Sequence, residues 1–327
     1  MNPQSQATIF NYFPYVPAAS PVVRLQSITD GDGLTNTISY NGTNAYSTNL
    51  ISQVVDPFGR TCSLAYDTNG HLTSITDVAG LISSFTYGSN DWVSSLTTPY
   101  GTTSFAITDT SGAQIVPNGR SVLVTQPDGG SQLYLYKDSA PGIAWAFDTN
   151  SLPSTAPFAN TFEHNEMNFR NTFHWGPKQY ANLSTTNISA MTAADFTKAR
   201  LRHWLKWDYF TVGETLSMER EPSPDNAGSI EGQRTWYDYT GKIFTTQNGT
   251  QVLPLFTARV TPDGTPQFTR TDRNSFGAGT VNIGTYWSNG VLAFRTNVTA
   301  YNPNDIDHIA MTNALKGVSP AQMNARA

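Results

Sequence analysis

One short segment of the chain brings acidic and imidazole side chains together and could hold a metal ion. Glu163, His164 and Glu166 lie within four residues, and His174 follows eight residues after Glu166. A catalytic zinc ion needs three such ligands and an open coordination position. The segment lacks the His-x-x-x-His spacing that places two imidazoles on one face of a helix. We therefore expect surface or strand-edge residues here, and neither a metal site nor a cofactor.

A second group of acidic residues resembles the start of a calcium-binding loop. The residues from Asp30 to Gly33 read Asp-Gly-Asp-Gly, but the twelfth position counted from Asp30 is Asn41. An EF-hand has a bidentate glutamate at that position. Because Asp-x-x-Gly recurs elsewhere in the chain as a turn, a turn explains these residues more simply than an ion site.

Glycoside hydrolysis would need two carboxyl groups about 5 to 10 Å apart. Nothing in the sequence brings one pair together, and there is no Gly-x-Ser-x-Gly motif of a serine hydrolase. A hydrolase with its site in residues 158–230 is accordingly the third of our functional hypotheses. The candidate acids are Glu163, Glu166, Glu214, Glu219 and Glu221.

The tryptophans offer another kind of chemistry, because exposed indole rings can stack against sugars. In strands, large aromatic residues more often pack against cross-strand neighbours or in a core. Binding to carbohydrate or to a cell wall is therefore the alternative function. The residues concerned are Trp92, Trp145, Trp175, Trp204, Trp207, Trp236 and Trp287.

A spacing of 21 residues organises the N-terminal third of the chain. Gly59, Gly80 and Gly101 each close a short turn, and Tyr66 and Tyr87 follow the first two glycines by seven residues. A fixed period of this length indicates one supersecondary unit that is copied and stacked. An active site, in contrast, is a set of unlike residues brought together once. The repeat therefore favours a scaffold or a surface over an enzyme.

Each repeat unit is typical of a β-hairpin. Residues 60–66 and 71–77 contain β-branched and aromatic residues, and the turn Asp67-Thr68-Asn69-Gly70 separates them. Glycine suits such turns because it adopts positive φ without strain, and aspartate can accept hydrogen bonds from the backbone that follows it. One hairpin alone is only marginally stable, so stacking of neighbours is expected.

The pattern Tyr66-Asp67-x-x-Gly70-x-Leu72-x-x-Ile75-x-Asp77-x-x-Gly80 resembles the YD repeat of the RHS family of bacterial surface and toxin proteins. The resemblance is strong over residues 28–101 and looser over 120–150 and 230–315. It implies a mainly β fold in which stacked hairpins form a long, curved, spiral or shell-like antiparallel sheet. It also implies a non-catalytic shell that encloses a toxin or presents a binding surface.

From the resemblance we infer a structural section of such a shell at or outside the cell surface, with no catalytic residues. The expected partners are the remainder of a larger RHS polypeptide or an enclosed cargo domain, and cell-surface glycans under the alternative function. The residues of the repeat-turn signature are Asp30, Gly33, Tyr40, Asp56, Gly59, Tyr66, Asp67, Gly70, Asp77, Gly80, Tyr87 and Gly101.

Composition supports an extracellular β-protein. Only 13% of the 327 residues are charged, 12% are aromatic, and the net charge is −5. Nucleic-acid binding is disfavoured because it requires a stripe of lysine and arginine. Hydrophobic residues make up 38% of the chain, which suffices for a core. We expect no membrane span, because no apolar run approaches about 20 residues, and we find no signal peptide in this chain.

The predicted organisation follows the distribution of prolines and turns. An irregular lead (1–20) precedes the repeat sheet (21–150), which is followed by an irregular insert with a helix (151–230), a second sheet section of RHS type (231–318) and a tail (319–327). The helix is expected over residues 192–207. Thr192 and Asp195 form its capping box. The residues of its apolar stripe are Phe196, Ala199, His203 and Trp207.

Overall fold

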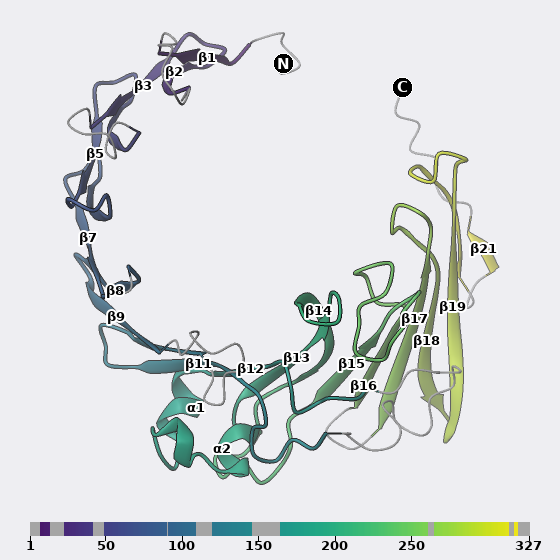
Figure 1. The fold of residues 1–327 in the computed structure, drawn as a ribbon. Helices are drawn as coiled ribbons and strands as arrows, with labels where there is room; N and C mark the ends of the chain where they lie inside the picture. The colour runs from purple at the N-terminus through teal and green to yellow at the C-terminus, as the bar shows by residue number, and fades with distance from the viewer. Residues whose placement is uncertain are drawn as a thin grey trace. The chain divides into compact units, whose positions relative to one another are not determined.

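The computed structural model describes residues 7–13, 23–41, 49–89, 91–108, 120–145, 164–260, 265–313 and 317–319. The chain divides into two compact units. The first unit comprises Met1–Ile107 and Leu123–Gly130, and the second comprises Thr108–Val122 and Ser131–Ala327. Both are built from antiparallel strands that follow one another along the chain (Figure 1). The prediction of a mainly β fold made of hairpins is confirmed.

In the first unit, each strand pairs with the next one in sequence, so its contacts are local. Among the described residues of this unit, only Ser27 and Val124 are buried, which leaves most side chains half-exposed. The strands are β1 (Ile9–Tyr12), β2 (Leu25–Thr29), β3 (Thr35–Tyr40), β4 (Ile51–Val55), β5 (Thr61–Tyr66), β6 (Leu72–Thr76), β7 (Ile82–Tyr87), β8 (Val93–Thr98) and β9 (Gly101–Thr108).

In the second unit, the antiparallel pairing also runs in sequence order from β11 onwards. The boundary between the units falls within β10 (Arg120–Thr125). The remaining strands are β11 (Ser131–Lys137), β12 (Asn171–Trp175), β13 (Arg200–Lys206), β14 (Val212–Arg220), β15 (Arg234–Asp238), β16 (Phe256–Val260), β17 (Pro266–Arg273), β18 (Gly279–Ser288), β19 (Val291–Tyr301), β20 (His308–Asn313) and β21 (Gly317–Ser319).

Two short helices cover one side of β11–β13, and the core of the second unit lies beneath them (Figure 1). They are α1 (Pro177–Ala181) and α2 (Ala193–Thr197), with a 3-10 turn at Ile188–Ala190 between them. Phe196 of α2 packs against Phe173 and Trp175 of β12, with ring centroids 4.8 and 5.6 Å apart. All three side chains are almost completely buried. The opposite side of these strands carries polar and charged side chains.

The helix predicted over residues 192–207 is wrong beyond its first turn. The capping box of Thr192 and Asp195 is present, but α2 ends at Thr197 and residues 200–206 form β13. In β13, Leu201, His203 and Leu205 are buried, and the residues between them are not. This period of two suits a half-buried strand, and pairing with β12 and β14 satisfies the backbone groups.

The insert predicted as irregular over residues 151–230 also needs correction. Within its described part, residues 171–175, 200–206 and 212–220 are strands of the sheet. Two bulges lie in the pairing of β13 with β14, between His203 and Trp204 and between Trp204 and Lys206. The extra residues lie on β14, where the neighbours Ser217 and Met218 are both buried, so the alternation of side chains is interrupted in that strand.

Candidate functional site

The aspartates of the repeat signature shape their turns through the same pair of hydrogen bonds. Oδ1 of each accepts from the backbone N–H two residues on and four residues on, at 2.8–3.0 Å. For Asp67 the donors are Asn69 and His71. Desolvation raises the pKa of Asp67, but the hydrogen bonds from His71 and Asn69 lower this pKa by a larger amount. The net shift of the pKa is therefore downward. The aspartates placed in this way are Asp30, Asp56, Asp67 and Asp77.

The glycines that close these turns have the backbone conformation that glycine favours. The φ values are 82° at Gly33, 78° at Gly59, 88° at Gly70 and 82° at Gly80. A Cβ atom would be strained in this conformation even though space is available. The backbone conformation therefore favours glycine at these positions.

The repeat tyrosines connect each hairpin with the strand that precedes it. The hydroxyl groups of Tyr40, Tyr66 and Tyr87 donate to backbone carbonyl oxygens 15 residues earlier, each at 2.8 Å. Tyr66 and Tyr87 also follow an identical bulge in their pairing with the next strand. They therefore occupy equivalent positions, as the 21-residue spacing predicts.

Gly101 differs from the other glycines of the signature. It starts β9 directly after the two-residue loop of Pro99 and Tyr100, and no aspartate precedes it. Its φ is 123°, and a Cβ atom built there would lie 2.6 Å from Cβ of Pro127. Close approach of Pro127 therefore adds to the φ requirement at this position.

The same turn also occurs in the second unit, where the sequence pattern did not reveal it. Oδ1 of Asn274 accepts from the backbone N–H of Phe276 and Ala278, and Gly277 has a φ of 80°. Asparagine thus replaces aspartate in the first position. A search for Asn-x-x-Gly as well as Asp-x-x-Gly would have found this turn.

The structure does not bring the suspected metal ligands together. His164 is buried and lies within hydrogen-bond distance of the hydroxyl of Ser217, whereas His174 contacts Gln132 on the open face of the sheet. Glu166 is paired with Arg170 and Lys206, and Glu163 lies outside the described residues. Within the described ranges, no group of three histidine, cysteine or acidic side chains could hold a metal ion.

Glu166 and His164 have pKa values set by different surroundings. Partial burial raises the pKa of Glu166, but hydrogen bonds from Lys206 and Arg170 outweigh burial and lower it. Burial lowers the pKa of His164 well below its ordinary value, and the charges of Lys242 and His203 act in the same direction. Glu166 is thus a paired anion and His164 a neutral core residue, neither of which is arranged as an acid or base at an open site.

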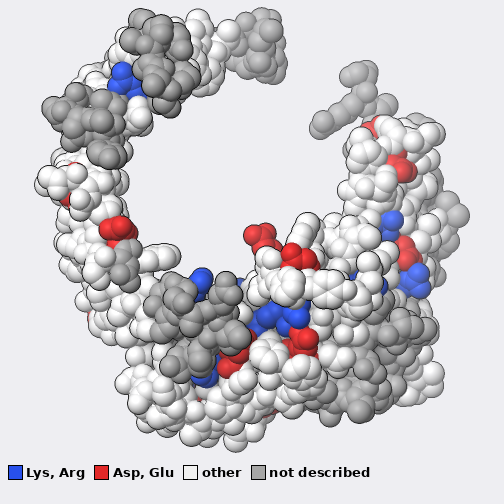
Figure 2. All heavy atoms as spheres, viewed as in Figure 1, with Lys and Arg blue, Asp and Glu red and all other residues white. Residues whose placement is uncertain are grey.

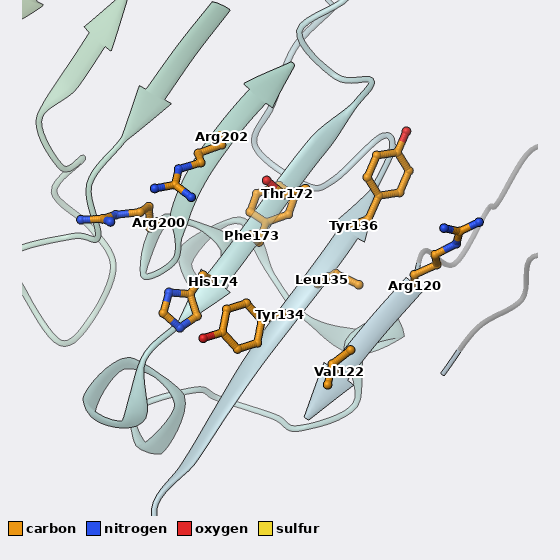
Figure 3. A pocket seen from close by; sticks show the side chains of 10 residues that line it. All are labelled: Arg120, Val122, Tyr134, Leu135, Tyr136, Thr172, Phe173, His174, Arg200 and Arg202. Carbon is orange, nitrogen blue, oxygen red and sulfur yellow. The ribbon is translucent and has the colours of Figure 1, made fainter. Parts of the chain in front are cut away.

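The open face of the second unit contains a pocket of about 300 Å³ that sequence reasoning missed (Figure 3). Two rows of cross-strand neighbours line it. One row runs from Tyr134 through His174 to Arg200, and the other runs from Tyr136 through Thr172 to Arg202. The other lining residues are Arg120 and Val122 of β10, Leu135 of β11 and Phe173 of β12. Recognising residues 200–206 as a strand would have placed Arg200 and Arg202 on one face, but not beside Tyr134.

Charged side chains gather over the second unit around β13 and β14 and are sparse over β2–β8 (Figure 2). The gathered charges include both signs. Arg200 pairs with Glu221 at 2.7 Å, and Arg202 lies 3.8 Å from Glu219. The open face of the second unit therefore has charged groups that could take part in recognition.

The tryptophans divide between core and surface. Trp175 and Trp236 are buried in the second unit, and Trp204 donates to the hydroxyl of Thr172. The most exposed of the remainder is Trp207, at 70%. Trp92, Trp145 and Trp287 are also exposed.

A family model described as RHS Repeat matches residues 66–103. Among solved structures, TcdB2-TccC3 without its hypervariable C-terminal region is 9% identical, with 90% of this chain and 17% of that chain covered and a TM-score of 0.28. The Tc holotoxin pore of Photorhabdus luminescens is 12% identical, with 93% and 17% covered and a TM-score of 0.24. A porin-like protein from Bacteroides uniformis is 11% identical, with 80% and 92% covered and a TM-score of 0.22.

TM-scores this low do not establish a shared fold, and the chain spans only 17% of the length of either toxin structure. No curated protein matches the sequence. The family match has a stronger basis, because it covers the residues whose aspartate, glycine and tyrosine geometry repeats. Residues 66–103 are therefore an RHS repeat.

Proposed function

We propose that this chain is a non-catalytic structural section of an RHS/YD-repeat shell, acting at or outside the bacterial cell surface as a toxin casing or an interaction surface. The observation that carries the proposal is the repetition of one turn and one tyrosine hydrogen bond in consecutive hairpins of an RHS repeat. Each hairpin pairs with its neighbours, so adding units extends a wall. The proposed partners are the remainder of a larger RHS polypeptide or a cargo domain within it.

The state of the acidic residues supports a non-catalytic role. Glu166 is held by two cations, the hydroxyl of Tyr237 donates to Glu219, and Glu221 pairs with Arg200. A glycosidase needs one carboxyl group kept protonated and a second one free to act. Three of the candidate acids in residues 158–230, Glu166, Glu219 and Glu221, are instead engaged with neighbours, whereas Glu214 is exposed on β14.

Location is part of the proposal. In the described part of the chain, no helix is long and apolar enough to cross a membrane. The low share of charged residues supports a place at the cell surface or outside the cell.

Protease protection tests the casing role directly. The complete polypeptide that contains this chain is purified and treated with a protease, and its fragments are mapped by mass spectrometry. If the chain forms part of a casing, the segment that it encloses stays intact, while the same segment expressed alone is digested. If every segment outside this chain is digested as fast in the complete polypeptide as when it is expressed alone, the casing role is overturned.

A hydrolase screen with metal analysis tests the non-catalytic character. We expect no turnover of esters, peptides or glycosides and no stoichiometric transition metal. Glu166→Gln and His164→Ala are then expected to alter stability alone. An activity that Glu166→Gln abolishes, or bound zinc that His164→Ala removes, would establish the hydrolase hypothesis instead.

Carbohydrate binding is the second candidate, and the exposed indole rings favour it. Trp92, Trp207 and Trp287 are 54%, 70% and 46% exposed, and such rings are suitable for stacking on sugars. A glycan array tests this candidate, with the three single alanine variants as probes. Specific binding that one of these variants abolishes would make the surface an adhesin.

A further inference from the structure

The pocket on the open face of the second unit is shaped by one small side chain between larger ones. Thr172 lies between Tyr136 and Arg202 in its row of cross-strand neighbours, while Tyr134 and His174 stand in the adjacent row (Figure 3). The hollow above Thr172 is therefore bounded by aromatic rings on one side and by guanidinium groups on the other. Its volume of about 300 Å³ is at the lower end for ligand sites.

The lining of the pocket contains three arginines and no acidic residue, although Glu221 and Glu219 lie beside Arg200 and Arg202. Desolvation lowers the pKa of His174, and the charges of Arg200 and Arg202 lower it further, with no opposing acid among the causes. Arg120 adds a third guanidinium to the lining. A bound anion would be attracted to this pocket, whereas a bound cation would be repelled.

Arg202 has hydrogen-bonding capacity that the protein does not use. Its Nε atom is buried and has no hydrogen-bond partner among the described residues. The nearest carboxylate, that of Glu219, is 3.8 Å away, and the hydroxyl of Tyr237 donates to the other oxygen of Glu219. In contrast, Nη2 of Arg200 already donates to both carboxylate oxygens of Glu221. The Arg202 side chain as a whole is 43% exposed, so the outer N–H groups of its guanidinium can donate to an incoming carboxylate.

The aromatic geometry favours a narrow side chain over a sugar ring. Tyr134 and His174 stack face to face, with ring centroids 4.3 Å apart and an interplanar angle of 9°. Their inner faces are occupied by each other, so neither presents both of its faces to a ligand. Sugar binding uses open aromatic faces, whereas a carboxylate on a short flexible stem needs only the guanidinium and the space above Thr172.

We propose that this pocket binds a glutamate or aspartate side chain of an acidic segment of a second polypeptide, with Arg202 as the principal contact. The carboxylate accepts hydrogen bonds from the guanidinium of Arg202, and Arg200 and Arg120 contribute positive potential. The stem of the side chain packs against Tyr136. This inference goes beyond the structural role of the chain and does not depend on it.

The test is a calorimetric titration of the full chain at low salt with an acetylated hexapeptide of alternating serine and glutamate. The control peptide has glutamine in place of glutamate. NMR of the His174 imidazole reports whether the peptide reaches the pocket. Inorganic phosphate and glucuronate are titrated in parallel as a free anion and an acidic sugar.

Three variants locate the binding. Arg202→Gln removes the contact, and Thr172→Phe fills the hollow while keeping every arginine; each is expected to weaken binding of the glutamate peptide by about tenfold or more. Arg259→Gln is the matched control, because Arg259 is an exposed arginine on β16 outside the pocket, and it is expected to change affinity by less than about twofold. Thermal unfolding confirms that each variant is folded.

The measurements distinguish peptide binding from no specific binding and from binding of a free anion or a sugar. A glutamate peptide that binds, shifts the His174 signals and is weakened by both pocket variants supports the proposal. No binding at about 1 mM peptide, or equal losses with Arg202→Gln and Arg259→Gln, overturns it. Phosphate or glucuronate binding at least as tightly as the peptide would reassign the pocket to a free anion or a sugar. None of these results bears on protease protection.

Discussion

The two units use the same antiparallel hairpins but obtain their stability in different ways. In the first unit, the repeated bonds are local ones, from aspartate to the turn backbone and from tyrosine to a carbonyl 15 residues earlier. In the second unit, Phe196, Phe173 and Trp175 form a core under two helices, and charged groups are buried beside it. A repeat sheet can be extended by copying its unit, whereas a core must be assembled once from distant residues.

This contrast predicts different responses to mutation. In a repeat array, each unit contacts only its neighbours, so damage stays close to the altered hairpin. In the second unit, one core side chain contacts several elements, so its loss weakens all of them together. Hydrogen exchange measured by mass spectrometry can follow the two units separately.

The largest effect is expected for Phe196→Ala. The side chain is 1% exposed and packs between the rings of Phe173 and Trp175, so its truncation should lower the free energy of unfolding by about 3–5 kcal/mol. Urea denaturation measures the change. Phe58→Ala is the matched control, because Phe58 is 73% exposed in a turn of the first unit, and it should cost less than about 0.5 kcal/mol. Similar losses in the two variants would contradict the contrast.

Acidification should destabilise the second unit first. Burial lowers the pKa of His203 from 6.5 to about 3. Because the folded state favours the neutral ring, the stability from this residue is complete above pH 6.5 and is lost as pH falls towards about 3. Within this window, each pH unit lowers the free energy of unfolding by about 1.4 kcal/mol. The total loss from pH 6.5 to about pH 5 is about 2 kcal/mol.

In the first unit, the pKa values of Asp56 and Asp67 are lowered: burial raises them, but hydrogen bonds from the turn backbone outweigh it. The stability from these carboxylates is lost only as pH falls below their ordinary value of 3.8. When hydrogen exchange is compared with the intrinsic exchange rate at each pH, protection at about pH 5 should therefore fall in the second unit before the first. His203→Gln should reduce the response of the second unit, and the remaining response comes from His164, whose pKa is also lowered by burial. Earlier loss of protection in the first unit would refute this prediction.

Gly70→Val should destabilise the first unit by about 1–3 kcal/mol, because valine is strained at positive φ. Gly70 has a φ of 88°. Gly284→Val provides the control: Gly284 lies in β18, its φ is not in the positive range, and a Cβ atom there meets nothing within 4 Å. Thermal unfolding should show a loss for the first variant and little change for the second. An unchanged midpoint in Gly70→Val would mean that the turn tolerates a side chain.

The smallest effects concern the repeat tyrosines. Tyr66→Phe and Tyr87→Phe each remove one hydrogen bond to a carbonyl group, which should cost about 1 kcal/mol in each case. The two losses should agree, because the positions are equivalent. Urea denaturation of both variants tests the equivalence. A clear difference between them would show that the hairpins are not interchangeable.

The β13 strand shows where sequence reasoning stopped. Phe196, Ala199 and His203 fit a helical stripe, and Leu201, His203 and Leu205 fit a strand equally well. The capping box at Thr192 correctly predicted where a helix begins. Where it ends depends on β12 and β14, whose backbone groups pair with residues 200–206. Tertiary pairing of this kind overrides local propensity.

The sequence by itself determined the repeat. The turns from Asp67 to Gly70 and from Asp77 to Gly80 depend on bonds that span at most four residues and on a φ that glycine favours. Such local interactions can be read from spacing alone, and so can the equivalence of Tyr66 and Tyr87.

Only the tertiary structure decided the pocket. Arg120, Tyr134, Thr172 and Arg202 come from four strands, and their sequence positions give no indication that they meet. The register of β11, β12 and β13 places Tyr136, Thr172 and Arg202 directly opposite one another. Residues two positions away along each strand lie on the same face of the sheet. Register is a property of the whole sheet, because it is fixed by turns and buried side chains far from the residues that it brings together.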